Sequence, residues 1–254
     1  MHEIIKPNLK ISTSIQEIIL ENLEFCMPRI GKTFDREKYS NIIKILDQKK
    51  TQTKRASELK WLTEQVNEIN VALENQPKIN DLEELKKKVG EIIGIATNEL
   101  KIKINRAPGI EITRMKALGD YDNVENVMRI KKGIGQSAAN ATIGHEYGHY
   151  LDTITELFFS DWQDEGFAEG ISRIVAQKLD ELTKIETKVY QLYEMLDFEK
   201  NILKGQESSP HCIGYTIFSI LEKEHGMQMY EHLIKREVLF EELMEKAGLE
   251  KFQQ

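Results

Sequence analysis

The chain has 254 residues and a mass of 29.5 kDa, which suits one large domain or a domain with a smaller part appended to it. Hydrophobic residues make up 40% of the chain and charged residues 30%, a balance that allows both a buried core and a charged surface and so excludes wholesale disorder. The formal net charge of −7 argues against a nucleic-acid-binding protein, and we expect no nucleic-acid partner.

The cysteines and the hydropathy of the chain indicate a reducing, aqueous compartment. Cys26 and Cys212 are too few for a disulfide scaffold and are not spaced as a metal-binding pair, so we expect two free thiols. No uncharged stretch reaches the roughly eighteen residues that crossing a bilayer needs. The first residues mix charged and apolar side chains too evenly for a signal peptide. We therefore expect a cytoplasmic protein without a membrane partner, in which histidine and carboxylate side chains would hold any metal ion.

The first hundred residues or so carry two consecutive amphipathic helix patterns. Apolar residues repeat at steps of three and four over Leu59–Leu73, and again over Leu82–Ala96. Pro77 is expected to end the first helix and Asn80 to cap the second. Both helices are too short for a coiled-coil rod, so we expect them to pack within the protein, on each other or on the rest of the chain.

The pattern then changes to the alternation that is typical of short strands. Residues 100–104, 110–112 and 127–130 are the strand candidates, and turn-forming residues are dense over 119–123. From Ser137 onward helix signals return and persist to the end. This order predicts an α+β protein dominated by helix, with a small mixed or antiparallel sheet before the helix that begins near Ser137.

The most informative motif is the segment His145-Glu146-Tyr147-Gly148-His149. On a helix, His145 and His149 lie one turn apart on the same face, so both imidazoles can reach one tetrahedral ion. Glu146 lies between them and can act on a water bound to that ion, which is the arrangement of the H-E-x-x-H zinc motif with its glutamate as general base. The flanking residues are small or apolar, which favours a helix buried near a cleft over a helix that merely exposes two histidines.

A catalytic zinc site needs a third protein ligand, and a second helix offers two candidates. Ser160 and Gln163 form a capping-box pattern that predicts a helix start, and Glu165 and Glu169 share one face of that helix, one turn apart. Glu165 could bind the metal while Glu169 accepts the ring N–H of a ligating histidine. An antiparallel return of the second helix along the first would instead bring Glu169 level with His149, so Glu169 stays open as the alternative ligand.

The HEYGH segment, followed by W-x-x-E-G-F-A-E over residues 162–169, resembles the gluzincin metallopeptidases, which include thermolysin-like and aminopeptidase N-like enzymes. The stretch from Pro210 to Gly226 resembles the part that ends many such domains, so the resemblance covers about residues 99–240. It implies a zincin-like fold, and the W-x-x-E-G match points to Glu165 as the third ligand of one Zn²⁺ per chain. Gly166 next to it would let the helix backbone approach the site closely.

A further helix is predicted by Ser209 as its cap and Pro210 at its first position. His211 and Tyr215 share one face of it, four residues apart. Either side chain could donate a hydrogen bond to the oxyanion that forms when a peptide bond is attacked. Tyr215 is slightly favoured, since the family more often uses a tyrosine or histidine from this region.

We interpret the chain as a zinc-dependent peptidase, a hydrolase that cleaves a peptide or protein inside the cell, with a zinc-bound water activated by Glu146. Residues 79–254 would form the zincin-like metallopeptidase domain, and residues 1–78 a helical N-terminal region packed on it. The small sheet would supply an edge strand for an extended substrate, bordered by residues 119–123. The alternative is a catalytically silent, zinc-stabilised binding or regulatory protein. Glu146 favours the enzyme, because a structural site has no use for a general base. Cleavage specificity and oligomeric state stay open.

Overall fold

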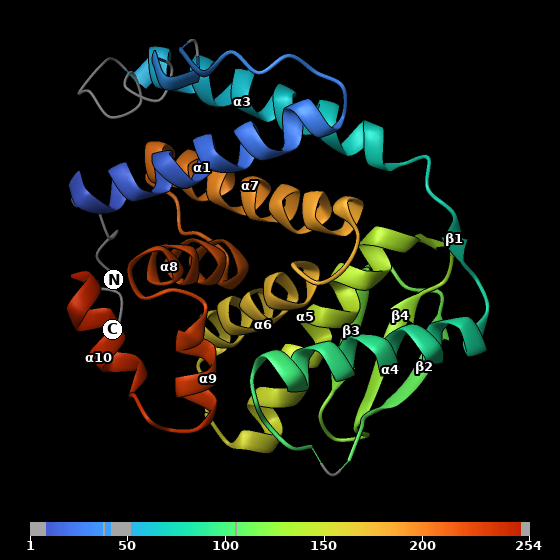
Figure 1. Cartoon of the computed structure of the whole chain (residues 1–254). Coiled ribbons are helices and arrows are strands. Elements are labelled where there is room, and N and C mark those ends of the chain that lie inside the picture. The colour runs from blue at the N-terminus through green and yellow to red at the C-terminus, as the bar shows by residue number, and fades with distance from the viewer. Residues whose placement is uncertain (1–8, 38, 42–51, 105, 250–254) are drawn as a thin grey trace.

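Helices dominate the protein and surround a central helix (Figure 1). The computed structural model describes residues 9–37, 39–41, 52–104 and 106–249. The helices are α1 (Leu9–Arg29), α3 (Gln52–Leu73), α4 (Leu82–Glu99), α5 (Gln136–Thr155), α6 (Asp161–Ala176), α7 (Glu181–Lys204), α8 (Pro210–His225), α9 (Gln228–Ile234) and α10 (Phe240–Ala247).

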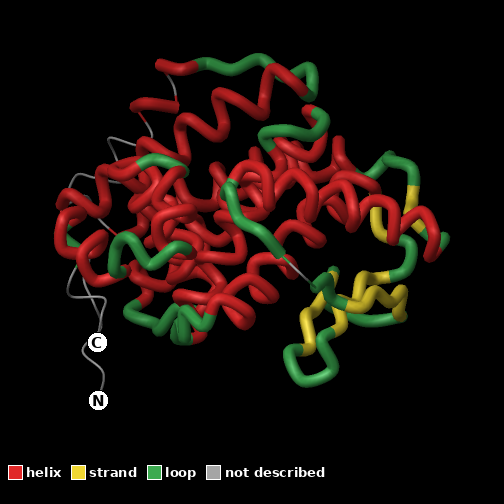
Figure 2. The backbone as a smooth tube through the Cα atoms, turned by 60° about the horizontal axis from the view of Figure 1, so that its bottom comes forward, coloured by secondary structure: helices red, strands yellow, loops and turns green. Residues whose placement is uncertain are grey.

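Two small sheets lie at one end of the molecule, beside the helices (Figure 2). In the first, β1 (Lys78–Ile79) pairs with β5 (Ile134–Gly135) in antiparallel fashion. The second has the order β2-β4-β3, with β2 (Gly109–Thr113) parallel to β4 (Val127–Lys131) and β3 (Gly119–Asp122) antiparallel to it. The expected α+β class, with a small mixed sheet ahead of α5, is therefore confirmed.

Two of the predictions for the strand region are wrong, for local reasons. Residues 100–104 form no strand, because they continue the hydrogen bonding of the C-terminal end of α4. The N–H of Leu100 donates to the carbonyl of Ala96 and that of Ile102 to the carbonyl of Thr97, so these residues complete the helix end.

The turn expected over 119–123 starts later than predicted. Gly119–Asp122 are strand β3, and the turn follows it. The Asp122 carboxylate accepts the backbone N–H groups of Val124 and Glu125, which places the tight turn after the strand rather than within it. Pairing with β4 explains why Gly119–Asp122 are a strand, since every residue of β3 pairs with a residue of β4.

The two amphipathic helices form as predicted, and both pack on the rest of the protein. The residues that carry the amphipathic pattern of α3 are buried, and α3 packs on α7; they are Leu59, Leu62, Val66, Ile69 and Leu73. Of the pattern residues of α4, only Leu82 is exposed, at 39%, while Leu85, Val89, Ile92 and Ala96 are buried, and the helix packs on α5 and α6. The residue that caps α4 is Asp81 and not Asn80. The Asp81 carboxylate accepts the N–H of Glu84 at 2.9 Å, whereas the Asn80 amide turns back to the carbonyl of Lys78.

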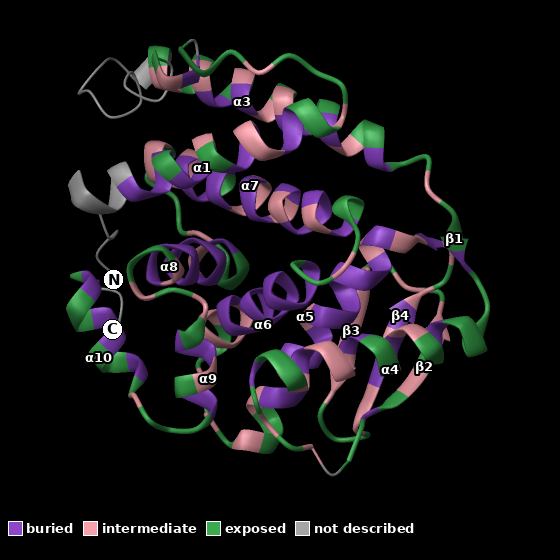
Figure 3. Cartoon of the chain, viewed as in Figure 1, coloured by how far each residue is buried: buried purple, intermediate pink, exposed green. Residues whose placement is uncertain are grey.

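Helix α6 forms the centre of the core, and every residue from Gly166 to Ala176 is buried (Figure 3). It packs on α5 and α8 and also contacts α4 and α7. On the other face of the molecule α1 and α3 pack on α7, and their buried residues belong to the same hydrophobic core. The motif helix α5 is thereby held against the most enclosed helix of the protein. The division of the chain at residue 78 stays a prediction.

Cys26 and Cys212 are both free and both buried, as expected. Among the described residues we find no helix whose length and hydropathy together would carry it through a lipid bilayer.

Replacement of the α4 cap tests the position of the helix start. Asp81→Ala removes the acceptor for the Glu84 N–H and should lower the free energy of unfolding by about 1 kcal/mol. Asn80→Ala is the matched control and should change it by less than about half of that. Urea denaturation of both variants gives the two values, and a larger loss for Asn80→Ala would contradict this assignment.

Candidate metal centre

Helix α5 presents His145 and His149 to the same point in space. They are one turn apart, their rings are nearly perpendicular at 87°, and their Nε2 atoms lie 3.1 Å from each other. Two ligand atoms 2.0–2.2 Å from a tetrahedral ion lie roughly 3.3–3.6 Å apart. The spacing of the two nitrogens is therefore close to that of two ligands of one ion.

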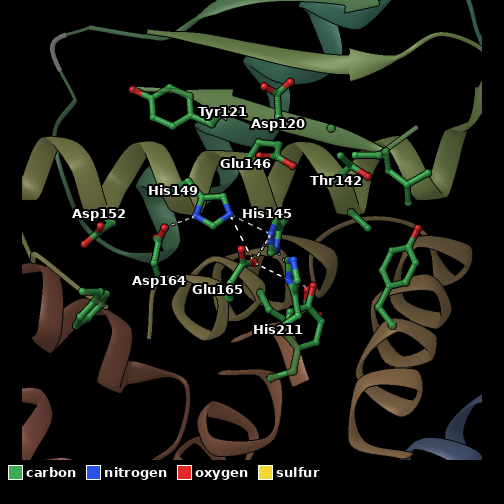
Figure 4. A pocket seen from close by; sticks show the side chains of 18 of the residues that line it. Asp120, Tyr121, Thr142, His145, Glu146, His149, Asp152, Asp164, Glu165 and His211 are labelled. Carbon is green, nitrogen blue, oxygen red and sulfur yellow. Dashed lines mark hydrogen bonds and ion pairs between the residues drawn. The ribbon is translucent and has the colours of Figure 1, made fainter. Parts of the chain in front are cut away.

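Helix α6 supplies a third candidate ligand atom. Glu165 Oε2 lies 3.3 Å from His145 Nε2 and 3.8 Å from His149 Nε2 (Figure 4). These three residues form the group of described His, Cys, Asp and Glu side chains whose ligand atoms converge closely enough to hold a metal ion. Glu165 Oε2 is also buried without a properly aligned hydrogen-bond donor among the described residues. A buried carboxylate oxygen in that position would be satisfied by a cation, so the residues fit a bound metal.

A close contact between α5 and α6 keeps Glu165 near the two histidines. The helices run antiparallel, with Gly148 against Ala168 and Gly144 against Ser172. A Cβ atom at Gly148 would lie 2.3 Å from Ala168 Cα, so a side chain there would push α6 away. Helix α6 begins where it was predicted, because the Ser160–Gln163 capping box is present.

Gly166 does not have the role expected of it. A Cβ atom there would lie 2.6 Å from the carbonyl oxygen of Gly214 and closer still to the ring of Phe218. Its missing side chain therefore allows α6 to approach α8 and not the metal helix. The consequence reaches the site indirectly, because α8 carries His211 and Tyr215.

The carboxylate that orients a ligating histidine is Asp164 in this structure. Its Oδ2 lies 2.8 Å from His149 Nδ1, whereas the Glu169 Oε2 expected in such a role lies 3.7 Å from His145 Nδ1. The other carboxylate oxygen of Glu169, Oε1, is paired with Arg173 Nη1 at 3.3 Å. Sequence reasoning missed Asp164, and the only signal for it was its place beside Glu165 in the first turn of α6.

The carboxylates around His145 favour positive charge at the centre. Burial lowers the pKa of His145, but the interactions with Glu165 and Glu169 outweigh burial and raise it to about 10. For Glu165 the balance is the reverse, since burial raises its pKa while His145 and His211 hold it well below its usual range. The carboxylates thus stabilise positive charge between the two imidazoles, and a divalent metal ion bound there would supply that charge.

Glu146 lies on the side of α5 that faces the sheet (Figure 4). It is 6% exposed, and a Cβ atom at Gly119 of β3 would lie 2.9 Å from its Oε1. Burial raises the pKa of Glu146, partly offset by His145 and His149. A carboxylate with a raised pKa beside a metal site is suited to accept a proton from water and to return it later.

His211 and Tyr215 both reach the site from α8, but in different settings. Ser209 caps this helix and Pro210 starts it, as predicted. The His211 side chain is 53% exposed, and its Nδ1 lies 2.8 Å from Glu165 Oε2. Tyr215 is only 8% exposed, and its phenol interacts with the buried carboxylate of Glu169, where burial holds the pKa of Tyr215 well above its ordinary value. Of the two, His211 is therefore the more accessible to a substrate.

A cavity of about 690 Å³ opens over the centre, with β3 along one side. β3 is one of the two edge strands of its sheet, and residues 119–121 line the cavity. Neither Lys nor Arg is among the described residues that line it. Its acidic lining residues are Asp120, Glu146, Asp152, Asp164, Glu165, Glu169 and Glu194. The cavity is therefore a place that attracts cations.

The chain matches no known protein-family model, no curated protein and no solved structure. The assignment of the centre consequently depends on its own residues and their geometry.

The ligand assignment is tested by metal content. Glu165→Ala should lose the metal, because it removes a ligand, whereas Asp164→Asn should keep the ion but bind it roughly 10- to 100-fold more weakly. Elemental analysis and competition with a chelator measure the two effects. Glu169→Gln is the control that should keep the metal. Loss of the metal from Glu169→Gln together with its retention in Glu165→Ala would make Glu169 the ligand.

Proposed function

We propose that this chain is a zinc-dependent peptidase with a zincin-like fold, of the gluzincin type that its motifs resemble. The observation that carries the proposal is that His145 Nε2, His149 Nε2 and Glu165 Oε2 lie 3.1–3.8 Å from one another, close enough to bind one ion. Glu146 lies next to this group and faces the same cavity. Three protein ligands beside a general base, at an accessible cavity, are typical of a catalytic rather than a structural zinc site.

Zinc is the ion that this set of donors fits best. Two imidazoles and one carboxylate suit a borderline-soft cation, whereas Mg²⁺ and Ca²⁺ prefer oxygen ligands throughout. We expect one zinc ion per chain. A substrate inside the cell would agree with the free thiols of Cys26 and Cys212, which an oxidising compartment does not favour.

The chemistry divides between the ion and the side chains around it. When bound, zinc supplies a water with a pKa near 7 and polarises the carbonyl of the scissile bond. Glu146 accepts the proton of the attacking water and delivers it to the leaving amine, which its raised pKa favours. Asp164 holds His149 in the orientation in which Nε2 faces the ion, because it accepts the N–H at Nδ1.

His211 is the side chain we assign to the oxyanion. The developing negative charge needs a donor other than the metal, and that donor must be exposed to the cavity. His211 is the more exposed of the two candidates, and its contact with Glu165 raises the pKa of its imidazole, so it is able to donate. Tyr215 has a different role in this proposal, since its phenol is committed to Glu169.

The edge of β3 offers the substrate a place to bind. An extended peptide can add to the free edge of a strand through backbone hydrogen bonds, and β3 borders the cavity beside Glu146. Such binding places the peptide between the sheet and α5, across the metal ligands. The acidic lining would favour substrates with basic residues near the cleaved bond.

Glu146→Gln tests the proposed reaction. It removes the base and no ligand, so the variant should keep its zinc and its fold while losing at least 100-fold in kcat for a cleavable peptide. The cleavable peptide is first identified by digesting a peptide library with the wild-type protein and analysing the products by mass spectrometry.

His145→Ala is the companion variant, which should lose zinc and activity together. Zinc-loaded wild-type protein that cleaves no member of the library would favour the catalytically silent zinc-stabilised binding protein. Full activity of Glu146→Gln would contradict the assigned base.

His211→Ala should lower kcat by roughly 10²-fold with KM little changed, because an oxyanion donor acts mainly in the transition state. Tyr215→Phe is the comparison and should keep most of the activity. Steady-state kinetics on the same peptide, with zinc content measured in parallel, distinguish the two. A greater loss of kcat in Tyr215→Phe than in His211→Ala would reverse the assignment.

A further inference from the structure

A second cavity, of about 350 Å³, lies among helices α1, α6, α7 and α8. None of its described lining residues also lines the cavity at the candidate metal centre. This volume is at the lower end of the range for small-molecule sites. Its lining combines four basic side chains with two acidic ones, Glu21 and Glu222, and with several apolar ones. The basic residues are Arg173, Lys184, Lys188 and Lys223.

Three of these four cations have carboxylate partners. Arg173 Nε lies 3.0 Å from Glu222 Oε2, Lys184 Nζ lies 2.7 Å from Glu181, and Lys223 Nζ lies 2.9 Å from Glu17. The positive charge of these side chains is therefore balanced within the protein.

Lys188 differs from them. No carboxylate of the described residues lies within ion-pair distance of it, and its ammonium donates instead to the neutral Oδ1 of Asn22 at 2.9 Å. It also lies over the ring of Phe25, 5.0 Å from the centroid. Burial lowers the pKa of Lys188, and the carboxylates of Glu222 and Glu21 in the same cavity oppose that shift from beyond ion-pair distance.

The surroundings of Lys188 hold it at the cavity. Asn22 is fixed because its Nδ2 donates to Gln191 Oε1 at 2.6 Å, and Gln191 Nε2 in turn donates to Ser219 at 2.6 Å. Asn22, Gln191 and Ser219 are all buried. This chain of hydrogen bonds orients the acceptor of Asn22 toward the ammonium and leaves the other two N–H donors of Lys188 for a further partner.

We propose that this cavity binds a small organic anion whose carboxylate or phosphate group pairs with Lys188. A negatively charged oxygen would accept from the remaining donors of Lys188 and supply a counter-ion within ion-pair distance, which no described carboxylate does. Ile18, Phe25 and Met227 line the same cavity and offer apolar contact to the carbon skeleton of the ligand. The proposal does not depend on peptidase activity.

Calorimetric titration of the metal-loaded protein tests this site, with inorganic phosphate and butyrate as separate probes at constant ionic strength. At least one of them should bind with a Kd of about 20 mM or tighter, and Lys188→Met should weaken that binding at least tenfold. The two probes distinguish a phosphate ligand from a carboxylate ligand. Lys86→Met, which removes an exposed lysine of α4, is the matched control and should leave binding unchanged.

Two results would overturn the proposal. One is the absence of binding by both probes up to about 20 mM in the wild-type protein. The other is binding that Lys188→Met leaves unchanged, as expected if the anion binds the metal ion instead. Should Lys188→Met fail to fold, Lys184→Gln at the rim of the cavity decides between the same outcomes, with an expected loss of about threefold.

Discussion

The contact of α5 with α6 is the constraint on which the candidate site depends. Two ligand atoms belong to α5 and one to α6, so the distance between the helices sets the distances between the ligands. A Cβ atom at Gly148 would lie 2.3 Å from Ala168 Cα, and Ser172 donates a hydrogen bond to the carbonyl of Ala141 across the same interface. A larger residue at Gly148 would separate His149 from Glu165, and the flexibility of a glutamate side chain would not restore the packing.

The enclosed position of α6 has an electrostatic cost, which the protein offsets by pairing. Arg173 and Glu169 are both buried, and Glu222 and Tyr230 complete the network, with the Tyr230 hydroxyl donating to Glu222 at 2.5 Å. A buried charge without its partner costs several kcal/mol, so the members of such a network depend on one another. One arm of this network ends at the metal centre through Glu169, and the other reaches the cavity that contains Lys188.

Local signals in the sequence were sufficient for the parts of the structure that local contacts determine. The spacing of His145 and His149, the capping box at Ser160 and the cap at Ser209 each concern residues within one helical turn, and all three occur as predicted. The strand prediction for residues 100–104 is wrong because these residues continue the hydrogen bonding of the end of α4, which their alternating pattern does not reveal. The turn prediction for residues 119–123 is wrong because pairing with strand β4 decides the structure of Gly119–Asp122. Asp164 was missed because only the packing of α6 on α5 brings it to His149.

A charged residue in the sequence, Arg173, helps to choose between Glu165 and Glu169 as the metal ligand, which the helical periodicity does not. Both glutamates share one face of α6, and an antiparallel return of that helix by itself favours Glu169. However, Arg173 follows Glu169 by four residues, a spacing that favours an ion pair on a helix, and the structure has that pair. Glu169 is the ion-pair partner of Arg173 Nη1 among the described residues, and its turning to a metal ion would leave that buried nitrogen without a carboxylate. Glu165 has no such commitment, because the groups near its Oε2 are the imidazoles of His145, His149 and His211. The arginine one turn further on therefore makes Glu165 the better candidate of the two for a metal ligand.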